Sequence, residues 1–60
     1  MNTQTKKIIE LMNAFKSIDA LEKTSAVYEE NGHDADATIA NITLDQFCGE
    51  AASILKEIVG

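Results

Sequence analysis

The dipeptide Asn31-Gly32, at the midpoint of sixty residues, is the feature that most constrains how this chain can fold. Glycine accepts the left-handed backbone conformation in which helices commonly end. The polar residues 33–36 follow it. The sequence therefore predicts a helical region over 3–31 and an acidic turn over 32–36. We treat 1–60 as a single small domain, because a chain this short buries only about 60% of its unfolded surface.

The segment 44–59 carries the clearest helical pattern. Thr43 is a favoured N-cap type, and Gln46 follows three positions later as in a capping box. Apolar residues then recur at steps of three and four, the spacing of one helix face. These are Leu44, Phe47, Cys48, Ala51, Leu55 and Ile58. We predict a helix over 44–59, with Cys48 buried on its apolar face and chemically unreactive.

The N-terminal region 3–31 contains two apolar stripes at helical spacing. The first consists of Ile8, Leu11, Met12 and Phe15, and the second of Ile18, Leu21, Ser25 and Tyr28. On one continuous helix the stripes would point in different directions, whereas a break near 16–17, with Ser17 as a cap, would turn both toward one core. No Gly or Pro enforces that break, so both geometries stay open.

Residues 34–43 fit either a short helix over 35–41, capped by Asp34, or an extended segment rich in β-branched residues. We favour the helix, because an isolated strand would have no strand to pair with. The predicted fold is all-α, a small antiparallel bundle of three or four helices that oligomerisation completes.

Charge and composition exclude several classes of function. The formal net charge is −5, and Lys6-Lys7 is the one pair of adjacent cations, which argues against direct nucleic-acid binding. The lysines precede no apolar run typical of a secretory signal, and no segment has the apolar length of a membrane span. A single cysteine cannot form an internal disulfide. We therefore expect a cytoplasmic protein without a membrane segment.

Catalytic and metal-binding patterns are weak. His33 stands near Glu29, Glu30, Asp34 and Asp36, but zinc would need further His or Cys ligands. Ile39 occupies the position where a calcium loop starting at Asp34 needs glycine. Three scattered glycines form no phosphate loop, and sixty residues rarely enclose a catalytic pocket. We expect no enzyme activity, no metal and no cofactor, and we interpret the cluster as a solvated acidic turn.

The function that we predict is that of a non-enzymatic protein-interaction or regulatory module. More apolar helix faces are present than one thin bundle can bury, which predicts self-association as a homodimer or binding to a protein partner. The predicted partner-binding residues are Ile18, Leu21, Val27 and Tyr28. The alternative is an acidic inhibitor that occupies a basic, nucleic-acid-binding surface of another protein, using acids that gather near 22–36.

Overall fold

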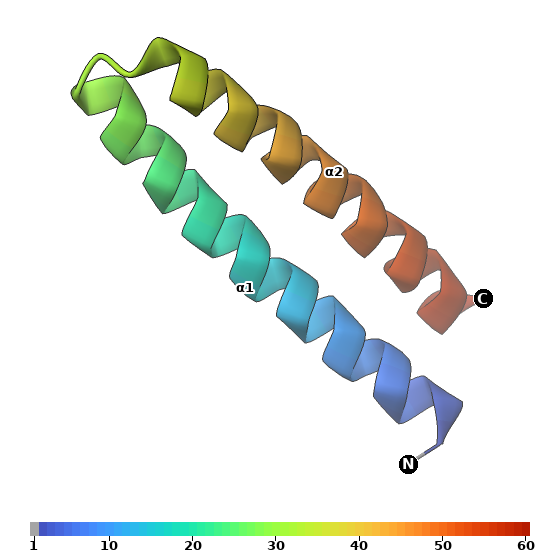
Figure 1. Cartoon of the computed structure of the whole chain (residues 1–60). Coiled ribbons are helices and arrows are strands. Elements are labelled where there is room, and N and C mark those ends of the chain that lie inside the picture. The colour runs from blue at the N-terminus through green and yellow to red at the C-terminus, as the bar shows by residue number, and fades with distance from the viewer. Residues whose placement is uncertain (1) are drawn as a thin grey trace.

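A computed structural model of the chain describes residues 2–60, which form two antiparallel α-helices (Figure 1). Helix α1 spans Thr3–Glu30 and helix α2 spans Asp34–Val59. The hairpin is 45 Å long and only 16 × 11 Å across. The all-α prediction is confirmed. The expected three or four helices are not found within the described chain, which is a helical hairpin.

Helix α1 is unbroken. The Asn2 side chain accepts a hydrogen bond from the Thr5 backbone N–H at 2.8 Å, and so caps the first turn. The Ser17 hydroxyl, proposed as the cap of a second helix, instead donates to the Asn13 carbonyl four residues earlier. Without glycine or proline to interrupt the hydrogen-bond ladder, the helix continues through 16–17 and both apolar stripes lie on one rod.

The turn between the helices ends α1 where the sequence predicted. Gly32 has φ of +73°, the left-handed region that glycine enters without steric strain. The Gly32 N–H donates to Glu29 and the His33 N–H donates to Tyr28, which is the hydrogen-bond pattern of a Schellman cap. The Tyr28 and His33 rings meet edge to face at 6.3 Å. This ring contact is the side-chain packing that commonly accompanies such a cap.

Helix α2 merges two segments that the sequence analysis separated. It begins at Asp34 rather than at Leu44, and His33 precedes it without a side-chain cap. Thr43, expected to be an N-cap, lies inside the helix, where its hydroxyl donates to the Ile39 carbonyl at 3.0 Å. Thr38 donates to Asp34 in the same way. β-branched residues are therefore accommodated by hydrogen bonds back to the preceding turn.

The helices meet along a seam whose positions alternate by three and four residues, a spacing of 3.5 that is typical of coiled coils. We call these buried or half-buried positions the seam. On α1 they are Lys7, Leu11, Ala14, Ile18, Leu21, Ser25 and Tyr28, and on α2 they are Ala37, Ala40, Leu44, Phe47, Ala51, Ile54 and Ile58. Four of the six buried residues in the described chain are alanines. Small seam residues allow the two helices to approach closely.

A single hairpin leaves much of its apolar surface in water. Its radius of gyration is 13.9 Å, whereas about 10 Å is typical of a compact domain of this length. Its accessible surface of 4339 Å² exceeds the roughly 3,800 Å² expected for a monomer of this mass. Nine large apolar side chains are exposed. The hairpin is therefore an elongated element with a thin core.

Candidate interaction surface

The seam divides the surface of the hairpin into two long flanks, and one of them is apolar near the chain ends. Phe15, Cys48, Ala52 and Leu55 line one shallow depression between the helices. Ile8 lies two turns before Phe15 on the same face of α1, and Val59 lies one turn after Leu55 on α2. We call the following set the apolar patch: Ile8, Met12, Phe15, Cys48, Ala52, Leu55 and Val59. All seven are exposed.

Exposure within the apolar patch is large for its bulky members. Phe15 and Met12 are 54% and 55% exposed, and Val59 is 76% exposed. Monomeric proteins rarely leave a contiguous group of such side chains in water without a function. The apolar patch is therefore the candidate interaction surface of this chain.

The opposite flank of the same region is polar. A second depression there is bordered by Glu10, Asn13, Ser17 and Glu50. Near the chain ends, the Lys7 ammonium donates to the Glu57 carboxylate at 2.6 Å. This hydrogen bond, together with the charges of Glu57 and Glu10, raises the pKa of Lys7 above its ordinary value, against a smaller opposing effect of burial. One flank of the hairpin is thus polar and can stay hydrated, and the other can bind an apolar surface.

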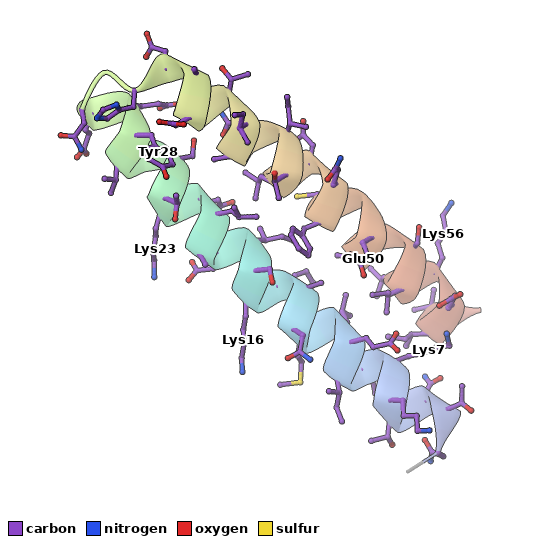
Figure 2. All side chains as sticks on the ribbon, viewed as in Figure 1. Lys7, Lys16, Lys23, Tyr28, Glu50 and Lys56 are labelled. Atoms are coloured by element: carbon purple, nitrogen blue, oxygen red, sulfur yellow. The ribbon has the colours of Figure 1, made fainter. Side chains whose placement is uncertain are left out.

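Charge is distributed unevenly along the hairpin. We call residues 17–47 the loop half, and residues 2–16 with 48–60 the open half. The loop half holds seven Asp and Glu against one Lys, a net charge of −6, and the open half holds three Glu against four Lys, a net charge of +1. Figure 2 shows Lys16 and Lys23 extending from α1 away from α2. Lys23 pairs with Asp19 at 3.1 Å, so the remaining six acids of the loop half have no salt-bridge partner within 2–60.

The four residues predicted to bind a partner do not form one exposed surface. Ile18, Leu21 and Tyr28 are half-buried in the seam. Val27 lies outside the seam and is 54% exposed, and it borders a shallow depression with Tyr28 and Lys23. Their role in binding a partner stays a prediction. The residues of the second predicted stripe, Ile18 to Tyr28, form part of the contact between the two helices.

Cys48 and Phe15 lie where the sequence analysis did not expect them. Cys48 is exposed, which contradicts its predicted burial, and Phe15, expected in the core, is exposed as well. Ile54, which is not part of the predicted stripe over 44–59, is the large buried side chain, with 7% exposure. Four residues of the predicted stripe lie in the seam, and only Cys48 and Leu55 lie outside it, each one position beyond a seam residue. Cys48 and Leu55 are also seven residues apart. The helical spacing of apolar residues therefore did not distinguish the seam from the flank beside it.

Within residues 2–60, no three His, Cys, Asp or Glu side chains come together as metal ligands would. Tyr28 contacts the His33 ring, and the acids that surround His33 in the sequence lie on exposed turns of α1 and α2. Every buried side-chain polar atom in this part of the chain has a hydrogen-bond partner. The buried Ser25 hydroxyl, for example, donates to the Asn41 side chain at 2.7 Å.

Over the described residues, neither helix combines the length and the apolar character needed to cross a membrane. Comparison with known proteins finds no match: no family model, curated protein or solved structure resembles the chain closely enough to indicate a family. The chemistry of the hairpin surface is therefore the basis for assigning a function.

Proposed function

We propose that this chain is a non-enzymatic protein-interaction module whose hairpins self-associate through the apolar patch. The observation that carries the proposal is the exposure of seven apolar side chains on one flank of a hairpin whose own buried residues are mostly alanines. Burying such a patch removes apolar area from water at roughly 25 cal/mol per Å². A homodimer would join two hairpins into a four-helix assembly.

Analytical ultracentrifugation from micromolar to millimolar protein tests this proposal. The test variant is Leu55→Glu, because Leu55 lies in the apolar patch and is 48% exposed. The matched control is Ile42→Glu, on the same helix, 55% exposed and outside the patch. In a two-fold dimer each substitution acts twice. We expect Leu55→Glu to raise the dimer dissociation constant at least about thirtyfold, from the lost burial of two half-exposed side chains.

Ile42→Glu should leave that dissociation constant within about threefold of the unsubstituted chain, since its side chain stays in water in either state. Helical content, measured by circular dichroism, should be the same in both variants. A monomeric mass for the unsubstituted chain at hundreds of micromolar would refute self-association. Equal weakening by both substitutions would refute the assignment to the apolar patch.

A second candidate function is favoured by the charge of the loop half. Six acids without a salt-bridge partner lie on a narrow rod, and such a surface attracts basic surfaces of other proteins at low salt. The chain would then act as an inhibitor that covers a nucleic-acid-binding site. Replacing Glu29 and Glu30 with glutamine should weaken binding to a basic partner and flatten its salt dependence. The same replacement should leave self-association through the apolar patch intact.

A further inference from the structure

We propose that two copies of this chain pack apolar patch against apolar patch with their long axes antiparallel and only their open halves overlapping. The inference rests on the proposed self-association and adds the orientation of the second copy. It is carried by two observations: the apolar patch stops at the middle of the hairpin, and the same flank turns acidic beyond that point.

The change of character is abrupt along both helices. On α1, one and two turns beyond Phe15 the same face presents Asp19 and Glu22, and Glu29 follows seven residues later. On α2, Asp45 precedes Cys48 by one turn. All four of these acids are exposed. One flank of the hairpin is thus half apolar and half acidic.

A parallel arrangement would place like charges against each other. If both loops pointed the same way, Glu22 and Asp45 of the two copies would meet across the interface. Each loop half has a net charge of −6, and close contact would bring both sets within a Debye length of about 8 Å. An antiparallel pair in full overlap would instead press the acids of each copy against the apolar patch of the other. Removing those carboxylates from water without a counter-charge is strongly unfavourable.

A staggered antiparallel pair avoids both conflicts. The two open halves overlap, and the loop halves extend in opposite directions, separated by far more than a Debye length. With its five bulky side chains 44% to 76% exposed, the apolar patch presents an area on the order of 500 Å² on each copy. A pair would then bury on the order of 1,000 Å², near the lower bound of specific interfaces. The structure thus favours a dimer that forms at high protein concentration.

The staggered arrangement places specific residues opposite each other. A two-fold axis across the middle of the apolar patch lays α2 along α2 of the partner subunit, in the reverse direction. Cys48, at one end of the patch, then lies opposite Val59, at the other end. Within one chain these two positions are eleven residues apart on one helix, about 16 Å. Disulfides require Cα atoms within about 7 Å, so only a second copy can join the two positions.

Disulfide trapping of the variant Val59→Cys, which retains Cys48, tests the orientation. The variant is oxidised with oxidised glutathione at a protein concentration at which the unsubstituted chain is dimeric. We then expect a covalent dimer. Tryptic peptide mapping should show position 48 joined to position 59. The matched control is Lys56→Cys, in the same helix turn but turned away from the apolar patch, and it should form at least tenfold less of the covalent dimer.

Two single-thiol chains complete the design. One is the unsubstituted chain, with Cys48 alone, and the other combines Cys48→Ser with Val59→Cys. Both should stay unlinked, because each thiol would lie about 16 Å, measured along the helices, from the same thiol of the partner subunit. Small-angle X-ray scattering of the unsubstituted dimer should give a maximum dimension of about 70 Å, from two 45 Å hairpins that overlap by about 22 Å.

The outcomes separate orientation from association. A dimer of about 45–50 Å without a 48-to-59 linkage would overturn the staggered antiparallel arrangement and leave self-association standing. A chain that sediments as a monomer at hundreds of micromolar would refute the proposed function itself, together with this inference. The expected 48-to-59 linkage and the extended scattering profile together would establish the staggered dimer.

Discussion

The loop half and the open half of the hairpin share one helical seam and differ in almost every other property. The loop half packs Ser25, Ala37 and Ala40 in its seam, has a net charge of −6 and ends in a well-defined Schellman cap. The buried seam residues of the open half are Ala14, Ala51 and Ile54, and the apolar patch lies on its flank.

The comparison shows that the features that align the two helices lie in the loop half. In the loop half, Gly32 sets where α1 ends, and the Ser25–Asn41 hydrogen bond aligns the two helices. Polar pairs in a coiled-coil seam commonly specify alignment rather than stability. Large apolar side chains pack in the seam of both halves, Leu21 and Phe47 in the loop half and Ile54 in the open half. In the open half, those that the seam does not cover form the apolar patch.

Ile54→Ala should have the largest effect on stability, since Ile54 is the bulkiest buried side chain among the described residues. Truncating a buried isoleucine lowers the free energy of unfolding by about 2 kcal/mol or more. Ser25→Ala, at the equally buried seam position of the loop half, should cost less than about 1 kcal/mol, because exposed Asn41 regains water as a partner. Urea unfolding at one fixed protein concentration measures both variants. Equal losses would mean that the two halves do not differ in this way.

Gly32→Ala should have an intermediate effect that is confined to the loop half. Alanine at φ of +73° is strained by about 1 kcal/mol, so the melting temperature should fall. The comparison is Gly49→Ala, in the middle of α2, where an added Cβ would meet nothing within 4 Å. That substitution should raise stability by up to about 1 kcal/mol, because alanine is the better helix former. Thermal melts that shift in the same direction for both would contradict this account of the turn.

The smallest effect is expected from titration of Lys7 in the open half. Its folded-state pKa is raised above the ordinary value of 10.5, chiefly by the hydrogen bond to Glu57. The stabilisation from this pair is therefore fully present below pH 10.5 and is lost as the pH rises through the folded-state pKa. The melting temperature should decline slightly over that alkaline range. In Glu57→Gln this alkaline decline of the melting temperature should be smaller. An unchanged decline would mean that groups other than Lys7 cause it.

The sequence predicted the helical content, the end of α1 at Asn31-Gly32 and the seam stripe from Ile18 to Tyr28. These features have local causes: a glycine that accepts a positive φ and residues three or four apart on one helix. The length of α2 was missed because Thr43 has the chemistry of an N-cap, and a hydroxyl can equally donate to the preceding turn.

The apolar patch itself was only partly predictable. The sequence showed an excess of apolar faces, but it assigned Phe15 and Cys48 to the core. Their exposure depends on how far each helix is rotated about its axis. That rotation is set by which small residues, such as Ala14 and Ala51, allow the helices to approach. Rotation is a property of the pair of helices, and a pattern within either helix alone does not determine it.

The three-residue turn also has a consequence for the order in which the hairpin folds. Bringing Ser25 to Asn41 closes a loop of 16 residues, whereas bringing Lys7 to Glu57 closes one of 50. Closing the longer loop from an unfolded chain costs about 1 kcal/mol more in chain entropy. Contacts should therefore form first beside the turn, where the seam is small and polar, and spread toward the larger side chains. The transition state for folding would then be structured at the turn, while the chain ends pair last and separate first.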